Sequence, residues 1–223
     1  MIENRILFVE GADDQHTIWA ICEHFKIEET FSVEIPDSKG KINKKARPNE
    51  LGGIDNVFKA TESNLEAAAY AVERLGIVID ADENLEKRWK RVKNILENAG
   101  YKDLPELPNP NGTIIKQDYL STFGVWIMPD NQLRGMLEDF LSFLVPPNDK
   151  VWTKAIKSSK EVLEMEEETF SEIHLSKAQI HAYLAWQKEP GKPFGTAITA
   201  KYLQADNPHC EKFVEWLKRL FVA

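Results

Sequence analysis

Residues 5–35 alternate short apolar runs with an amphipathic segment. Residues 5–9 form an apolar run that predicts a buried strand, and residues 31–35 alternate as a second strand would. Between them, apolar residues recur at helical spacing and predict a helix over 13–25. The order strand, helix, strand is the opening of a βαβ unit, which is typical of α/β proteins.

The most distinctive pattern is the apolar run 76–79, which ends in Asp80 and Asp82 with one alanine between them. A continuous run of this kind predicts a parallel strand that is buried on both faces. Because side chains alternate along a strand, the two carboxylates are expected to point to the same side. A helix is predicted over 85–99, and Gly100 marks its end.

The remaining patterns complete an α/β core and a helical tail. Two more strands are predicted over 113–115 and 124–128. Further helices are predicted over 54–71, 131–144 with Leu133 facing inward, 149–168, from a Ser176 N-cap to 185, and around 213–220. We therefore expect a Rossmann-like, mostly parallel sheet flanked by helices over residues 1–145. Residues 146–223 form a helical extension packed on this core, with one continuous domain as the alternative.

Composition narrows the class of protein. The only cysteines are Cys22 and Cys210, which excludes a disulfide framework and a cysteine zinc site. No apolar run is long enough for a membrane span, and residues 1–5 lack the pattern of a secretory signal, so we expect a cytoplasmic protein. The net charge of −8 argues against a broad nucleic-acid-coating surface but is compatible with a local basic groove.

Acidic residues also follow the first predicted strand. Glu10 stands at its end, Gly11 permits a tight turn, and Asp14 lies in the first turn of the next helix. If the first and third strands are parallel neighbours, Glu10, Asp80 and Asp82 converge at the carboxyl edge of the sheet, where α/β proteins bind ligands. Oxygen ligands of this kind suit Mg²⁺ or Mn²⁺. Capping and the helix dipole offer a purely structural role for Asp14.

Together, a glutamate after the first core strand and an Asp-x-Asp after a later strand resemble the Toprim domain. This domain is shared by bacterial primases, topoisomerases and the overcoming-lysogenization-defect (OLD) nucleases, and the resemblance covers roughly residues 5–145. Primases and topoisomerases usually have a glycine shortly after the second motif. Here Glu83 and Asn84 follow it, which is more similar to the OLD-type nucleases. In size the chain resembles short stand-alone bacterial Toprim-like proteins.

The resemblance implies hydrolysis of phosphodiester bonds in DNA or RNA with two Mg²⁺ or Mn²⁺ ions about 4 Å apart. It also implies a later acidic ligand, for which Glu138 is the candidate, although a solvated acid on an amphipathic helix is the alternative. The implied metal ligands are Glu10, Asp14, Asp80, Asp82 and Glu138. The implied catalytic residues are Glu10, Asp80 and Asp82 with Lys177 or Lys192 as a late lysine.

Two basic segments accompany the acidic motifs. One is the polar loop 36–51, and the other is the outer side of the helix 85–99. Each alone is typical of a solvated surface, but beside a phosphate-cleaving site each could guide a nucleic-acid backbone. The candidate nucleic-acid-binding residues are Lys41, Lys44, Lys45, Lys87, Arg88 and Arg91.

Three alternatives stay open at this level. A nucleotide-sugar glycosyltransferase would use Asp80 and Asp82 but leave Glu10 without a role, and a haloacid-dehalogenase phosphatase fits less well because its motif follows the first strand. A non-catalytic Toprim module would bind metal, nucleic acid or a partner. The chain has no Gly-x-x-x-x-Gly-Lys-Ser/Thr motif, so an ATPase acting with it in defence or repair would be a separate protein. Oligomerisation is also open.

Overall fold

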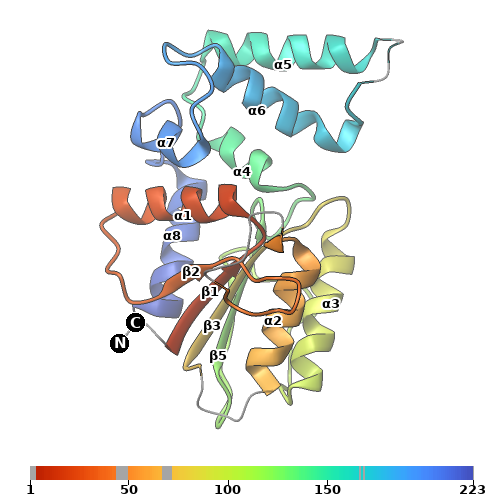
Figure 1. Ribbon diagram of the computed structural model, residues 1–223, viewed down its shortest axis with the longest axis vertical. Coiled ribbons are helices and arrows are strands. Elements are labelled where there is room, and N and C mark those ends of the chain that lie inside the picture. The colour runs from red at the N-terminus through yellow and green to blue at the C-terminus, as the bar shows by residue number, and fades with distance from the viewer. Residues whose placement is uncertain (1–3, 44–49, 67–71, 166, 168, 223) are drawn as a thin grey trace.

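The computed structural model describes residues 4–43, 50–66, 72–165, 167 and 169–222 and contains one five-stranded sheet within them (Figure 1). The strands are β1 (Arg5–Val9), β2 (Ser32–Glu34), β3 (Arg74–Asp80), β4 (Thr113–Ile115) and β5 (Thr122–Met128). Their spatial order is β2-β1-β3-β5-β4; neighbouring strands are parallel except for β4, which is antiparallel to β5. The predicted α/β class and mostly parallel sheet are therefore confirmed.

Eight α-helices and a short 3₁₀ helix accompany the sheet in the described residues. They are α1 (Ala12–His24), α2 (Ile54–Glu66), α3 (Leu85–Asn98), α4 (Leu137–Phe143), α5 (Lys150–Leu163), η3 (Glu172–His174), α6 (Leu175–Ala185), α7 (Phe194–Thr199) and α8 (Pro208–Phe221). Local capping starts several of them: the side chains of Asn84, Asp149 and Asn207 accept backbone N–H groups at the starts of α3, α5 and α8.

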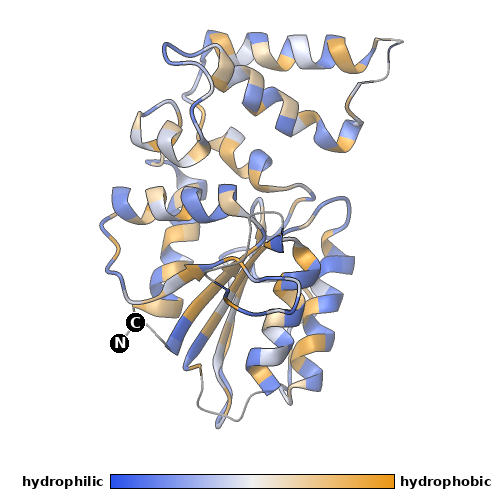
Figure 2. Ribbon diagram, in the orientation of Figure 1, coloured by the Kyte–Doolittle hydropathy of each residue, from blue (hydrophilic) through white to orange (hydrophobic). Residues whose placement is uncertain are grey.

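The sheet separates two hydrophobic cores, because successive strand side chains point to opposite faces. On one face, Phe8 and Ile77 pack with residues of α2 and α3. On the other face, Leu7 and Val78 pack with residues of α1 and α8. Figure 2 shows the central strands as largely hydrophobic along their length. The apolar runs of the sequence therefore form strands that are covered on both faces of the sheet.

The C-terminal helix α8 forms part of this core. Gly76 and Gly124 are paired across β3 and β5, and a Cβ atom at Gly124 would lie 2.3 Å from Leu220. The missing side chains let α8 lie directly on the strands. In contrast, α5 and α6 pack against each other away from the sheet (Figure 1). The predicted extension thus divides into a projecting helical pair and a helix that completes the core.

The segment before α4 differs from the predicted helix. The helix begins at Leu137, because residues 131–135 form a turn in which Asn131 has a φ of +64°. The Asn131 side chain accepts the Ile127 N–H at 2.8 Å and holds this turn on the end of β5. Leu133, which was expected to face inward, is 53% exposed.

The N-cap prediction at Ser176 is also wrong. Helix α6 begins at Leu175 because η3 leads directly into it, and the Ser176 hydroxyl donates to Asp139 Oδ2 at 3.2 Å. Across the described ranges, no helix combines the length and apolar character that a bilayer crossing demands.

Candidate functional site

The carboxyl ends of β1 and β3 lie side by side and bring two predicted residues together. Val9 is in register with Val78, so Glu10 emerges next to the end of β3. Glu10 Oε1 accepts the backbone N–H of Asp80 at 2.8 Å. The turn Gly52–Gly53 closes against the same point, with the Gly53 N–H donating to the Glu10 carbonyl oxygen at 2.8 Å. The site therefore begins at the centre of the parallel sheet.

Helix α4 contributes the other wall of the site. The backbone N–H of Leu137, at the start of α4, donates to Asp80 Oδ1 at 3.0 Å. The next residue, Glu138, is only 5% exposed, and Asp14 in the first turn of α1 is 8% exposed. Helix N-termini favour negative charge, which explains part of how these carboxylates are accommodated.

Glu10, Asp14, Asp80 and Glu138 form what we call the acidic cluster. Burial raises the pKa of Glu10 to about 7, although the Asp80 N–H and Arg88 act in the opposite direction. Burial, followed by the charges of Glu10 and Glu138, raises the pKa of Asp14 to about 8. The pKa of Asp80 is raised well above its ordinary value by burial and then by Glu10, Asp14 and Glu138. Like charges packed this closely favour a bound cation or protons.

Lys177 of α6 contacts the acidic cluster. Its Nζ atom lies 3.2 Å from Glu138 Oε1, while half of its own side chain stays exposed. Together with the hydrogen bond between Ser176 and Asp139, this ion pair holds α6, and with it the projecting pair α5 and α6, against α4. The second lysine candidate, Lys192, instead pairs with Glu189 at 2.8 Å in the turn between α6 and α7. Of the two lysines, Lys177 is therefore the one in contact with the acidic cluster.

Asp82 lies at the rim of the site, in a different geometry from the one that strand alternation predicts. The strand ends at Asp80, and Asp82 has a φ of +51°. Its backbone exchanges two hydrogen bonds of 2.8 Å with Gly135, and its carboxylate forms an ion pair with Arg88 of α3. Asp82 is thus fixed by the loop before α4 and by α3.

Two cavities flank Asp82, between the core and the start of α6. The smaller has a volume of about 300 Å³ and is lined by residues including Arg134, Asp139 and Gln179. The larger has a volume of about 580 Å³, and its lining combines the acidic Asp82 and Glu83 with Lys87, Arg88, Arg91 and His174. Each cavity reaches the rim of the acidic cluster from a different side.

The predicted nucleic-acid-binding residues have different surroundings. Lys87 is exposed at the start of α3. Arg88 is largely buried by its ion pair with Asp82, and Arg91 pairs with Asp55 at 2.9 Å while its guanidinium lies over the Phe58 ring. The remaining candidates belong to the loop 36–51: Lys41 is exposed, whereas Lys44 and Lys45 lie outside the described residues.

The acidic cluster has the donor chemistry of a Mg²⁺ or Mn²⁺ site but not an assembled set of ligands. In the described part of the chain, no three acidic, histidine or cysteine side chains are grouped as they would be around an ion. One oxygen each of Glu10 and Asp80 accepts a backbone N–H, and Glu138 is paired with Lys177. Mg²⁺ commonly uses only one or two carboxylates and retains several waters, so Glu10 and Asp80 suffice as its first protein ligands.

Sequence reasoning missed the roles of Gly135 and Asp139. Gly135 has a φ of +138°, and a Cβ atom there would lie 2.6 Å from Asp139 Oδ2. The same Asp139 oxygen accepts the Met136 N–H at 2.8 Å, so Asp139 shapes the loop that holds Asp82. A glycine four residues before an acid was the available signal, but the bridge to Asp82 joins distant parts of the chain.

The chain belongs to the family described as "Protein of unknown function (DUF3226)", whose model matches residues 4–222. No curated protein and no solved structure gives a significant match. The matched region runs from β1 to α8 and includes every element of the acidic cluster. The comparisons therefore identify the family and leave the activity to be argued from the site.

Proposed function

We propose that this DUF3226 protein is a Mg²⁺- or Mn²⁺-dependent phosphodiesterase that acts on nucleic acid, with a Toprim-like site similar to that of OLD-type nucleases. One observation carries the proposal: the buried Asp14 and Glu138 and the half-buried Glu10 and Asp80 gather at the carboxyl edge of a mostly parallel sheet. Burying several carboxylates costs stability unless cations or protons compensate for them. Strongly perturbed carboxylates in such a place are characteristic of functional sites.

The protein groups divide into holding and guiding roles. Glu10 and Asp80 hold the cation, while Asp14 and Glu138 add negative charge behind them. A bound divalent ion supplies a Lewis acid for the phosphate and lowers the pKa of water. Arg88 keeps Asp82 at the rim, and Lys87 faces the larger cavity through which a phosphodiester backbone reaches the site. Lys177 forms an ion pair with Glu138 and neutralises charge in the cluster.

The test uses neighbouring acids on one helix as a matched pair. Asp14 is buried in the cluster, whereas Asp13 is exposed on the same turn of α1. Supercoiled plasmid, circular single-stranded DNA and RNA are incubated with the protein and Mg²⁺, Mn²⁺ or EDTA. We expect metal-dependent cleavage that is lost in Glu10→Gln and Asp14→Asn and kept in Asp13→Asn. Equal cleavage by all the variants would contradict the site assignment.

A non-catalytic metal-binding module is the second candidate. The ion pair between Glu138 and Lys177 favours it, because Lys177 is then occupied by a carboxylate of the protein and not by a phosphate of the substrate. Calorimetry with Mn²⁺ separates the two candidates: binding that Asp14→Asn abolishes, without cleavage of any nucleic acid, supports the module. Turnover of a nucleotide sugar would instead favour the glycosyltransferase, which has no need of Glu10.

A separate ATPase partner remains part of the proposal because the chain has no phosphate-binding loop motif of its own. The expected setting is DNA or RNA processing in defence or repair. The partner is tested by measuring whether ATP stimulates cleavage only when a co-purifying ATPase is present.

A further inference from the structure

The edge of the sheet at β2 carries an open groove far along the chain from the acidic motifs of β3. The β2-edge groove has a volume of about 780 Å³ and lies between α1, the following loop and β2. Its apolar wall includes Trp19, Ile27, Phe31 and Val33. Trp19 is 48% exposed, which is unusual for so large a side chain. In the described residues, β2 pairs with β1 alone, so it is an edge strand.

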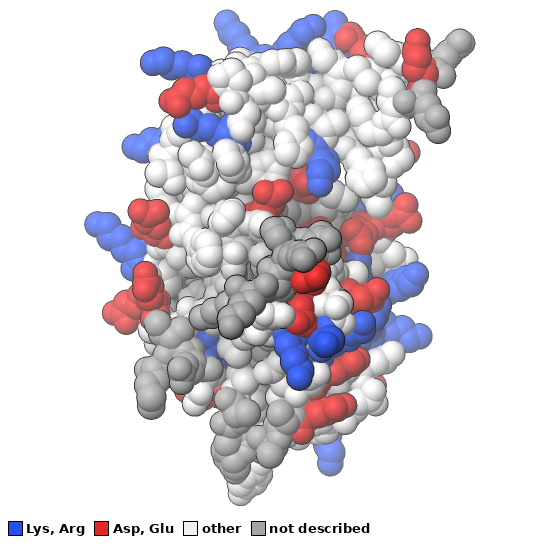
Figure 3. Space-filling view, viewed as in Figure 1, with Lys and Arg blue, Asp and Glu red and all other residues white. Residues whose placement is uncertain are grey.

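The charge around this groove has a single sign. All the charged residues that line it are glutamates, namely Glu23, Glu28, Glu29 and Glu34. Lys26 belongs to the same loop but does not line the groove. Figure 3 shows acidic side chains, with basic ones beside them, at the left-hand edge of the molecule, where the loop between α1 and β2 lies in Figure 1. The groove therefore pairs an apolar wall with a negative rim.

The floor of the groove is held in place by contacts with the core. Phe31 stacks on Phe221 of α8 with ring centroids 4.2 Å apart. The adjacent Thr30 hydroxyl donates to the Phe221 carbonyl oxygen at 3.1 Å, and Gln15 of α1 donates to the Val33 carbonyl oxygen at 2.7 Å. A groove built on such fixed elements loses little conformational entropy when a ligand binds.

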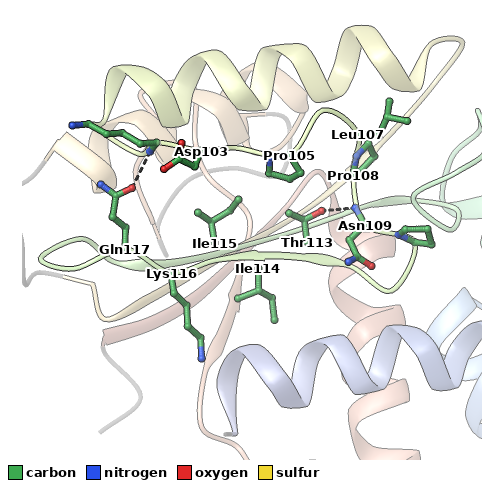
Figure 4. A pocket seen from close by; sticks show the side chains of 12 residues that line it. Asp103, Pro105, Leu107, Pro108, Asn109, Thr113, Ile114, Ile115, Lys116 and Gln117 are labelled. Atoms are coloured by element: carbon green, nitrogen blue, oxygen red, sulfur yellow. Dashed lines mark hydrogen bonds between the residues drawn. The ribbon is translucent and has the colours of Figure 1, made fainter.

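The opposite edge of the sheet provides a comparison. A cavity of about 760 Å³ lies along β4, and its lining includes Pro105, Pro108 and Pro110 with charges of both signs (Figure 4). The Asn109 N–H donates to Thr113 Oγ1 at 2.8 Å, which ties the proline-rich loop to the strand. Prolines and covering loops are the usual protection of an edge strand. At β2 the groove residues include no proline or lysine.

We propose that the β2-edge groove is a docking site for an extended, basic segment of another protein. Its apolar side chains would cover Trp19 and Ile27, and its lysine or arginine residues would face the four glutamates. Addition of an extended peptide at a sheet edge is a common mode of recognition, in which side-chain pockets supply the specificity. The proposal is independent of the nuclease activity, since it uses none of the acidic cluster.

The experiment selects ligands from a displayed random peptide library against the immobilised full chain. We expect enrichment of sequences in which basic and apolar residues alternate. A peptide synthesised from the enriched sequences should bind the Trp19→Ala variant about tenfold more weakly or worse, since an exposed tryptophan is a typical hot spot. It should lose a similar amount of affinity with the double variant Glu28→Lys and Glu29→Lys, and bind more weakly at higher salt.

The matched control is the double variant Glu62→Lys and Glu66→Lys, which makes the same charge change on exposed positions of α2. Unchanged affinity in this control supports the groove, because general attraction to an acidic protein would be weakened equally. No enrichment, enrichment of acidic peptides, or binding that the groove variants leave unchanged would overturn the proposal. The alternative occupant is a second copy of this chain, which analytical ultracentrifugation tests. A dimer that dissociates in the groove variants would assign the surface to self-association instead.

Discussion

The two ends of β1 and β3 carry opposite kinds of electrostatics. At the amino ends, Arg5 and Arg74 both pair with Glu73, at 3.1 and 3.2 Å. The same arginines donate to the last carbonyl oxygens of α8, at 2.7 Å to Phe221 and 2.6 Å to Leu220. At the carboxyl ends, the acidic cluster has far less positive compensation. Charges of opposite sign are paired at the amino ends of the strands, whereas negative charge is in excess at their carboxyl ends.

The pKa values express the same difference. Hydrogen bonding to Arg5 lowers the pKa of Glu73, whereas burial raises the pKa of Glu10 to about 7. A charged group that stabilises the fold is paired with oppositely charged groups of the same chain, whereas a charged group that binds a ligand lacks such partners. We therefore expect the amino end of the strands to contribute to stability, and the proposed chemistry belongs to the carboxyl end.

The largest expected effect is on cleavage. Asp80→Asn should lower the rate about a thousandfold, the scale at which loss of one electrostatic group impairs a polar active site. Glu73→Gln, at the other end of the same strand pair, should leave the rate per folded molecule unchanged. Plasmid and oligonucleotide assays at saturating Mn²⁺ measure both. Comparable losses in the two variants would remove the contrast between the ends.

The pH dependence of stability should separate the ends next. The pKa values of Glu10 and Asp14, about 7 and about 8 in the folded protein, lie above their ordinary values of 4.5 and 3.8. Their favourable contribution is complete below those ordinary values and is lost as the pH rises through 7 and 8. Urea unfolding in EDTA should therefore show stability falling from pH 5 to pH 9.

Two variants test the origin of this slope. Asp14→Asn should make it less steep, because one of the titrating carboxylates of the acidic cluster is removed. Glu73 has a lowered pKa, so its contribution is present above its ordinary value of 4.5 and is lost only in acid. Glu73→Gln should leave the slope between pH 5 and pH 9 as it is. A slope that survives Glu10→Gln, Asp14→Asn and Asp80→Asn together would refute the assignment.

Divalent metal should restore part of the stability that is lost at high pH. At a free Mg²⁺ or Mn²⁺ concentration of 100 times the dissociation constant, ligand binding raises the free energy of unfolding by about 2.7 kcal/mol. The gain should vanish in Asp80→Asn and persist in Arg74→Met. Thermal unfolding over a metal titration at pH 8 provides the measurement, with Ca²⁺ and high NaCl as checks on general ionic effects.

Loss of the amino-end arginine should affect folding alone. Arg74 is largely buried and bonded to the Leu220 carbonyl oxygen, so Arg74→Met should lower the free energy of unfolding by about 2 kcal/mol, as for other hydrogen bonds to charged groups. Lys218→Met, which removes only an exposed ion pair with Glu215 on α8, should cost less than about 1 kcal/mol. Urea unfolding measures both, and unchanged cleavage per folded molecule completes the test.

The smallest effect concerns nucleic-acid binding. Lys87→Ala should weaken binding of single-stranded oligonucleotides a few-fold and reduce the slope of log affinity against log salt concentration by about 1, as for one phosphate contact. Lys212→Ala on the exposed side of α8 is the control and should change neither quantity. An equal change in both variants would indicate attraction without a defined path to the site.

Local patterns were sufficient for much of the fold. The apolar runs predicted β1, β3 and β5, and helical spacing predicted α1, α3 and the buried face of α8. These predictions succeed because burial imposes a period of two on strands and 3.6 on helices, which short stretches of sequence record. The helix expected over 131–144 failed at its start, since the Asn131 turn is stabilised by a bond to β5 and not by periodicity.

The candidate site shows the same division. Sequence alone determined that Glu10 and Asp80 stand at the carboxyl ends of buried strands, and it predicted a cation site there. Tertiary structure decided that β1 and β3 are neighbours, that Arg88 holds Asp82, and that Lys177 reaches Glu138. It also decided that the last helix completes the core while α5 and α6 project from it. The reason is physical: periodicity reports which face of an element is buried, whereas strand order and ion pairs depend on contacts between residues far apart in the chain.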